Sequence, residues 1–500
     1  MKFDLEATLR FSKDAELLEK ELHGIIEEFN RDLKEKFGDA KISDWSLSRD
    51  QLDIAIVSET RRRSHDILLQ FRNILSKKLG KKYKIGVRGI DVRKYEISFD
   101  LEREPLRDVT IPFADVKIEG RKVRMRLKET GEDFLSRNYI DRMVKLVREK
   151  VENQYYEGKK EFWKLIWKSE EKVPVWDKDP TEEMLRRGWI VQGPTKGKWF
   201  YRPQAAAILR AMERIAIEEV LKPLGFQEVI ESHIVPFDVW LKTGHLEGMP
   251  GEIYYVCEPR TRDILEWERF VDLVKITREV PEDELRKNIS LPSAGICYAQ
   301  CPVIYWSLKG KTIAEESLPL LIYDRTAISG RYESGGRHGI ERVDEFHRIE
   351  PVYIGKPEQL IELRDKLIER YKHVFNNILD LEWRMAWVTP WYLQQAGKVE
   401  EEGYGEGVIG TMDFEAYLPY RGERESSKWL EFQNLSILGD KYIKSFNIKT
   451  QKGELWSGCS GIGLERWTAA FLAQKGLEPE NWPDGFRRYL DRLPEGIKIL

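Results

Sequence analysis

The sequence has little cysteine and little histidine, and these shortages limit the kinds of protein it can be. Four cysteines and seven histidines occur in 500 residues. A small secreted domain held by disulfides needs a much denser cysteine framework. We therefore expect reduced thiols and a cytoplasmic enzyme.

Long apolar runs are also absent from the sequence. No segment approaches 18 consecutive apolar, uncharged residues, so we expect no membrane span. The first twenty residues, MKFDLEATLRFSKDAELLEK, are charged throughout and lack the apolar centre of a secretory signal. Membrane and secretory functions are therefore not expected.

Charged residues, in contrast, are abundant and unevenly distributed. They make up 34% of the chain, and hydrophobic residues make up 41%, which is enough for full-sized cores. Residues 51–150 contain 25 Lys and Arg against 16 Asp and Glu. Basic clusters in a chain whose net charge is only −3 are typical of contacts with a phosphate backbone. For any one cluster taken alone, a solvated face is the favoured interpretation.

The pattern of expected elements divides the chain into two main parts. Helices are expected over 12–37, 61–80 and 133–170, strands over 41–60 and 83–101, and a hairpin over 112–128 that turns at Glu119 and Gly120. We interpret residues 1–165 as an α+β domain, 166–180 as a polar linker and 181–500 as a second domain.

Residues 324–355 contain the most informative pattern of the second domain. Arg331 and Glu333 share a face of one expected strand, and Arg348 and Glu350 share a face of the next. An antiparallel hairpin would bring these four charges together. Because unpaired buried charge is costly, the pattern indicates a binding site, with a solvated edge hairpin as the alternative.

This stretch resembles motif 2 of the class II aminoacyl-tRNA synthetases, with Arg331 and Glu333 in its R-x-E element and Glu341-Arg342-Val343 after the loop. A helix over 203–224 with the strand QEVIESHIVP resembles motif 1, and WSGCSGIGLERWTAAFL resembles motif 3, with Arg466 in its arginine position. The resemblance implies an antiparallel catalytic sheet flanked by helices and a homodimer formed through motif 1. It also implies that Arg331 holds the α-phosphate of ATP and the amino-acid carboxylate, Glu333 reads adenine, and Arg466 contacts the far phosphates.

Two cysteines extend the resemblance. Cys301 lies in AQCPVIYWSLKG, which is similar to a zinc-ligand segment of threonyl-tRNA synthetases, and Cys459 precedes motif 3. Together with Glu350 they make the whole chain similar to the atypical, zinc-dependent seryl-tRNA synthetases found mainly in methanogenic archaea. In that family, two cysteines and a glutamate hold one Zn²⁺, which binds the amino group of L-serine. The wide spacings suit ligands from three strands of one sheet.

Other interpretations of the cysteines and histidines stay open. From the residues alone, Cys301 and Cys459 could be ordinary buried cysteines, and Cys297 is a rival ligand. We expect Cys257 in the core. The threonyl enzymes use one cysteine and two histidines, and neither His338 nor His347 stands at the corresponding positions. His347 should point away from Arg348 and Glu350 and pack or contact tRNA.

The resemblance also assigns the remaining ligands. It implies ATP contacts for Arg342, Val343 and Glu431, the last with Mg²⁺, and serine contacts for Ala299, Arg348, Gln395 and Asn434. Glu431 and Asn434 are three residues apart, so both roles require a β-bulge or a strand end. The basic N-terminal domain is expected to bind tRNA(Ser), and also tRNA(Sec).

Three alternative functions are weighed against this one. A threonyl-tRNA synthetase-like enzyme would share most of the site. A non-catalytic RNA-binding paralogue would have no need for an intact set of Arg331, Glu333, Glu431 and Arg466. An amino-acid:carrier-protein ligase would lack the tRNA-binding domain.

Overall fold

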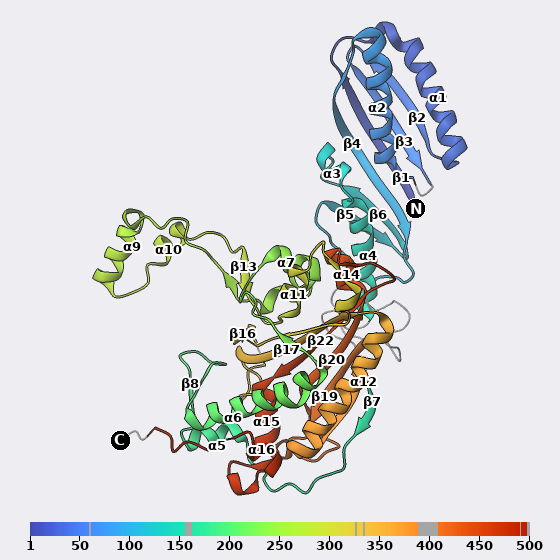
Figure 1. Cartoon of the computed structure of the whole chain (residues 1–500). Helices are drawn as coiled ribbons and strands as arrows, with labels where there is room; N and C mark the ends of the chain where they lie inside the picture. The colour runs from blue at the N-terminus through green and yellow to red at the C-terminus, as the bar shows by residue number, and fades with distance from the viewer. Residues whose placement is uncertain are drawn as a thin grey trace. The chain divides into compact units, whose positions relative to one another are not determined.

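The computed structural model describes residues 1–59, 62–155, 163–325, 328–333, 336–388, 409–490 and 492–497. They form two compact units, Met1–Lys160 and Glu161–Leu500 (Figure 1). None of the helices in these ranges is long and apolar enough to cross a membrane.

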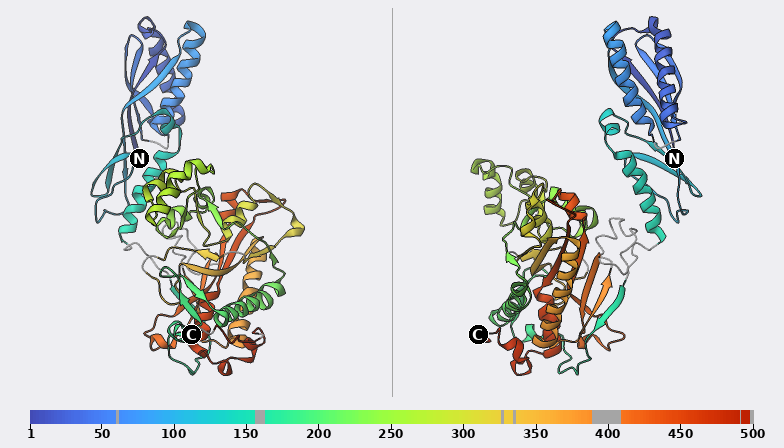
Figure 2. Two further views of the ribbon diagram at one scale, coloured as in Figure 1. Left: turned by 90° about the vertical axis from the view of Figure 1, so that its left-hand side faces the viewer. Right: turned by 45° about the vertical axis from the view of Figure 1, so that its right-hand side comes forward.

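The N-terminal unit contains an antiparallel sheet of six strands in the order β2-β3-β1-β4-β6-β5. Figure 2 shows the ribbon from two further sides. The strands of this unit are β1 (Lys2–Phe11), β2 (Lys41–Ser48), β3 (Gln51–Ser58), β4 (Val87–Asp100), β5 (Ala114–Glu119) and β6 (Lys122–Leu127), and its helices are α1 (Glu19–Phe37), α2 (Ser64–Tyr83), α3 (Glu132–Ser136) and α4 (Tyr139–Tyr155). Alternate residues of β1, such as Phe3, Leu5 and Leu9, are buried with the apolar faces of the helices.

Several predictions for this unit are confirmed, and two need correction. The hairpin over 112–128 forms as β5 and β6, while β1 was not expected and the first helix begins only at Glu19. The helix expected over 133–170 is confirmed for Tyr139–Tyr155 and wrong for Trp163–Lys168. Residues Trp163–Lys168 form strand β7 instead, because they pair with β18 at the edge of the second unit's sheet.

The second unit is built on a nine-stranded sheet in the order β10-β15-β17-β22-β20-β19-β18-β7, with β16 paired to β17. The strands are β10 (Gln227–Glu228), β15 (Leu320–Asp324), β16 (Ile328–Gly330), β17 (Glu345–Gly355), β18 (Trp383–Val388), β19 (Gly410–Ala416), β20 (Leu430–Gly439) and β22 (Trp456–Gly463). The pairs are antiparallel except β10–β15. The segments TMDFEAYLPY and WLEFQNLSI, which the sequence alone indicates as strands of an antiparallel sheet, contain β19 and β20.

Helices cover both faces of this sheet. The main ones are α6 (Pro203–Ile215), α7 (Phe237–Thr243), α11 (Cys301–Ser307), α12 (Pro357–His373), α14 (Lys441–Phe446) and α15 (Leu464–Lys475). Ile349 and Tyr353 of β17 enter a core with α6, α12 and α15, and of these α12 runs alongside the strands in Figure 1. Val352 and Ile354 enter a second core with α7, α11 and α14. The two sides of β17 therefore belong to different cores.

Smaller elements complete the second unit. They are α5 (Pro180–Arg186), β8 (Ile190–Gln192), β9 (Trp199–Tyr201), β11 (Ile234–Pro236), α8 (His245–Gly248), β12 (Tyr255–Val256), α9 (Ile264–Thr277), α10 (Glu282–Asn288), β13 (Ala294–Ile296), β14 (Thr312–Ile313), β21 (Lys449–Thr450) and α16 (Asp484–Arg487). The strand expected over 227–236 is interrupted between β10 and β11. Helices α9 and α10 extend away from the rest of the unit (Figure 1).

Candidate functional site

The charged residues of motif 2 form a connected cluster after β16. Glu333 accepts a hydrogen bond from Arg331 at 2.6 Å through Oε2 and one from Arg342 at 2.7 Å through Oε1. Burial opposes ionisation of Glu333, but the two arginines outweigh it and lower the pKa of the carboxyl. The strand expected over 331–333 is not formed, because β16 ends at Gly330. Ion pairs, rather than strand alternation, bring these side chains together.

A glycine in the motif 2 loop makes room for this cluster. A Cβ at Gly336 would lie 2.6 Å from Nη2 of Arg342 and 2.8 Å from Oε1 of Glu333. Any other residue would push the Glu333–Arg342 pair apart. Next to the pair, Val343 is buried, and Asp344 accepts two hydrogen bonds from Arg337, both at 2.8 Å. These contacts fix the return of the loop into β17.

Cys301, Glu350 and Cys459 converge on one small volume. Their potential ligand atoms all lie within 4.8 Å of one another, and all three side chains are buried. Glu350 lies on β17 and Cys459 on the neighbouring β22, where it pairs with Val352. Cys301 is the first residue of α11, so the expectation of three strands is wrong for this ligand. Two strands and a helix start provide the group.

The chemistry of these three residues fits a bound cation. Oε2 of Glu350 accepts from the backbone N–H of Gln300 at 2.7 Å, but the buried Oε1 has no hydrogen-bond partner among the described residues. Such an orphaned oxygen is costly unless a ligand satisfies it. A hydrogen bond with Cys459 and burial together raise the pKa of the Cys301 thiol. A divalent cation would reverse that effect by stabilising both thiolates.

The other two cysteines lie apart from this group. Sγ of Cys297 lies 3.2 Å from the carbonyl oxygen of Ala299 and 3.5 Å from Oε1 of Glu231. Cys257 is exposed, so the prediction that it lies in the core is wrong. The reason is that strand β12 has two residues and ends at Val256, before the cysteine.

Arg348 lies between the group of Cys301, Glu350 and Cys459 and the end of strand β22. Its Nε is 3.1 Å from Oε2 of Glu350. A Cβ at Gly461 would lie 2.4 Å from Nη2 of Arg348, so a glycine is needed here to leave room for the guanidinium. Asn434 accepts a hydrogen bond from the backbone N–H of Gly461 at 2.8 Å, which brings it to the same strand end. Gln395 lies outside the described residues.

The β-bulge required for Glu431 and Asn434 is present in β20. Phe414 of β19 pairs with Gln433, whereas the next residue, Glu415, pairs with Glu431, so one residue of β20 is unpaired. This shift allows Glu431 and Asn434 to serve the same face.

Arg466 is held at the same edge of the sheet. Its Nη1 donates to the carbonyl oxygen and to Oε2 of Glu431, at 2.9 and 3.0 Å, and its Nε donates to the carbonyl oxygen of Glu341 at 3.1 Å. Arg466 therefore contacts both Glu341, which follows the motif 2 loop, and Glu431 of β20. The segment that resembles motif 3 forms strand β22 followed directly by helix α15.

Two acidic residues at the site were missed in the sequence. Glu252 lies 3.3 Å from Nε of Arg331 and belongs to none of the three motifs. Asp413 pairs with Asn434 in the sheet, and burial together with Glu431 and Glu415 raises its pKa. The alternation of Asp413 and Glu415 with apolar residues in TMDFEA was the available signal for the second.

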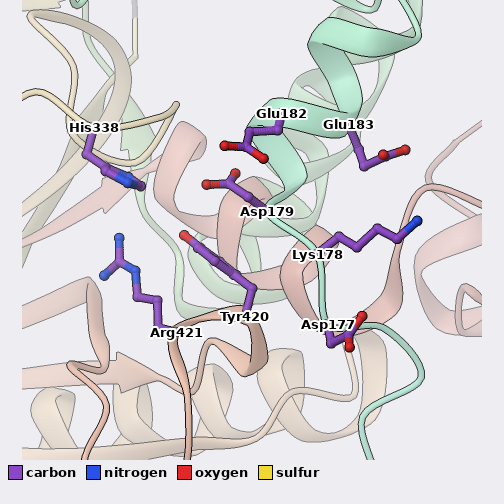
Figure 3. Close-up of a pocket in the computed structure, with 8 residues that line it drawn as sticks. All are labelled: Asp177, Lys178, Asp179, Glu182, Glu183, His338, Tyr420 and Arg421. Atoms are coloured by element: carbon purple, nitrogen blue, oxygen red, sulfur yellow. The ribbon is translucent and has the colours of Figure 1, made fainter.

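A surface pocket of about 540 Å³ lies beside the motif 2 loop (Figure 3). Its lining residues are Asp177, Lys178, Asp179, Glu182, Glu183, His338, Tyr420 and Arg421. Three of these donate to one buried oxygen of Glu341: His338 at 2.7 Å, Tyr420 at 3.1 Å and Arg421 at 2.6 Å. The pocket is rich in carboxylates, so it does not suit a phosphate. It is connected to the motif 2 cluster through the three hydrogen bonds that hold Glu341.

Comparisons with known proteins agree on one family. Residues 1–149 match the sequence profile of a tRNA-binding domain. Type-2 serine–tRNA ligases of Methanococcoides burtonii and Methanothrix thermoacetophila are each 45% identical to the chain, with 100% of both proteins covered in each case. The chain belongs to the type-2 serine–tRNA ligase family.

A solved structure of this family agrees with the fold. The crystal structure of A. aeolicus tRNASec in complex with M. kandleri SerRS matches with a TM-score of 0.88 at 30% identity, covering 100% of this chain and 99% of that one. The predicted resemblance to the methanogen-type seryl enzymes and the predicted fold class are both confirmed. Serine–tRNA ligases are aminoacyl-tRNA ligases, so the chain belongs to a family of aminoacyl-tRNA ligases.

Proposed function

We propose that this protein activates L-serine with ATP to form seryl-adenylate and transfers the seryl group to tRNA(Ser), and also to tRNA(Sec). The observation that carries the proposal is the buried group of Cys301, Glu350 and Cys459 beside Arg348. A site with two thiols, a carboxylate with a free oxygen and an adjacent arginine suits the two ends of an α-amino acid.

Zinc fits the ligand group. Cys301, Glu350 and Cys459 would hold one Zn²⁺ per chain and leave a fourth position open, as in sites that bind a substrate. When bound, the ion would accept the α-amino group of serine in its neutral form. The histidines of the described ranges lie outside this group, which supports serine over the threonyl-type ligand set of one cysteine and two histidines.

The arginines supply the remaining charge. Arg331 and Arg348 would orient the serine carboxylate, and Arg331, Arg342 and Arg466 would bind the phosphates of ATP. During activation, a carboxylate oxygen bonds to the α-phosphorus and diphosphate leaves, so negative charge develops where fixed cations stabilise it. Glu333 is shared by two arginines in the free protein. ATP would draw these arginines onto phosphate and leave Glu333 to accept from the adenine amino group.

The other assignments follow from the same arrangement. Glu431 would hold Mg²⁺ with the phosphates, Val343 would contact ATP, and Ala299, Gln395 and Asn434 would line the serine site. Residues 1–160 would bind tRNA in the cytoplasm, and residues 161–500 would form the catalytic domain. The expected boundary at 165, with a linker over 166–180, falls inside β7, which pairs with β18 in the catalytic sheet. The helix over 203–224 and the strand after it would form the homodimer.

Serine- and threonine-dependent ATP–diphosphate exchange, with and without a chelator, tests the proposal. We expect strong exchange with serine, much weaker exchange with threonine, loss with the chelator and recovery with zinc. Equal exchange with threonine would favour a threonyl-type enzyme. No exchange with either would favour a non-catalytic RNA-binding paralogue, and seryl transfer to a carrier protein instead of tRNA would favour the carrier-protein ligase.

A further inference from the structure

His347 makes a two-point contact with a buried carboxylate. Its backbone N–H donates to Oε2 of Glu465 at 2.8 Å, and its Nδ1 lies 2.7 Å from Oε1. The Glu465 side chain is 2% exposed. A carboxylate taken out of water needs donors for both oxygens, and one residue supplies both. This contact therefore fixes orientation as well as distance.

The pair joins the two halves of the site. His347 precedes Arg348 on β17, but its side chain points to the opposite side of the sheet, toward α15. Glu465 lies in the first turn of α15, directly before Arg466. Because β17 is paired on both of its edges, it is the fixed partner. The contact between His347 and Glu465 therefore holds the first turn of α15 against β17.

We propose that His347 and Glu465 are positioning residues for amino-acid activation, which hold Arg466 at the distance from Arg348 that ATP and serine require. The inference rests on the proposed function. Arg466 reaches Glu431 and the Glu341 carbonyl from this turn. A shift of about 1 Å at a reacting centre can cost about 10²-fold in rate, so a loosened turn is costly even though neither residue touches substrate.

The charge of His347 adds a pH dependence. The hydrogen bond with Glu465 outweighs burial and raises the pKa of His347, while Arg210 lowers it and Glu213 raises it from α6. The ring of Tyr201 on β9 contacts the imidazole edge-on. Since the pKa is raised, the full ion pair is present below the ordinary histidine value and is lost as pH rises through the folded value. Neutral imidazole can keep the hydrogen bond but not the charge.

Exchange kinetics of the full-length, zinc-loaded protein at saturating serine test the inference between pH 6 and pH 9. We expect His347→Ala to lower kcat/KM for ATP by about 10- to 100-fold, with the KM for serine changed about twofold or less. His347→Asn should recover most of the loss, because its amide can donate to Glu465. In wild type, the KM for ATP should rise as the pH passes the folded pKa of His347 and the ion pair is lost. His347→Asn and Glu465→Gln should both lack this rise.

A matched control is His373→Asn, since His373 lies 3.6 Å from Glu219 at an exposed site of the same unit. It should keep wild-type kinetics. A lower melting temperature with an unchanged ATP KM and pH profile in the His347 variants would show a merely structural role and overturn the inference. Wild type without any serine-dependent exchange would overturn the proposed function instead. In that case, calorimetric binding of a non-hydrolysable ATP analogue should still weaken in His347→Ala, and equal binding would overturn the inference.

Discussion

The two units of the molecule use charge in opposite ways. In the N-terminal unit, the partners of a typical ion pair are solvated: the side chains of Lys78 and Glu28 are 40% and 60% exposed. In the catalytic unit, the carboxylates of Glu341 and Glu350 are 1% exposed. Solvated charges act on a partner at long range and contribute little to stability. Buried charges need partners, and so they mark the place where a ligand is bound.

The difference also separates what each unit recognises. A mostly solvated, basic surface suits the repeating phosphates of an RNA, for which many weak contacts add together. A few buried ions in fixed positions suit one small substrate and one transition state. The following experiments test this contrast, from the largest expected effect to the smallest.

Loss of a half-buried arginine of the site should have the largest effect. Arg331→Ala and Arg466→Ala should each lower serine-dependent exchange by about 10²–10³-fold, because each removes a fixed cation from the phosphates. Circular dichroism and melting curves should stay close to wild type. Arg186→Ala is the control, since its side chain is 66% exposed and pairs with Glu183 on the same helix. Near-normal exchange in Arg331→Ala would remove the basis of the motif 2 assignment.

Removal of the N-terminal unit should separate tRNA binding from activation. A variant lacking residues 1–160 keeps β7, which pairs with β18 in the catalytic sheet. It should retain serine-dependent exchange and lose most tRNA charging. In the full-length protein, the logarithm of tRNA affinity should fall linearly with the logarithm of salt concentration. An unchanged KM for tRNA in the shortened variant would mean that this unit has another role.

Neutralising one solvated pair should have the smallest effect. Asp115 and Lys128 form an ion pair on the N-terminal sheet with side chains 64% and 60% exposed. Asp115→Asn should shift the melting temperature by about 1 °C or less and leave serine-dependent exchange unchanged. A large destabilisation, measured by calorimetry, would contradict the idea that this unit's charges are not structural.

The sequence predicted the elements whose residues alternate clearly, and it failed where tertiary contacts decide. The strands around Asp413 and Glu431 are indicated by the sequence pattern, and the strand around Cys459 by the resemblance to motif 3. Residues Trp163–Lys168 have the sequence WKLIWK, a run too short to be told from the helical pattern before it, and they form a strand by pairing with β18.

The candidate site shows the same division. Arg331, Glu333 and Arg348 could be named from spacing within one segment, and the need for a bulge at Glu431 followed from strand geometry. Glu252 and Glu465 could not be assigned, because their partners, Arg331 and His347, are distant in sequence. Cys301 was placed on a strand, although Pro302 at the next position is typical of a helix start.

Metal analysis of purified cysteine variants tests the central claim most directly, namely that the buried charges of the catalytic unit are arranged around one Zn²⁺. Wild type and Cys297→Ser should each contain one zinc per chain and show serine-dependent exchange. Cys301→Ser and Cys459→Ser should lose the zinc and the exchange but keep a folded core, because the ion binds substrate rather than holding the fold. A full complement of zinc in Cys301→Ser or Cys459→Ser would contradict the account.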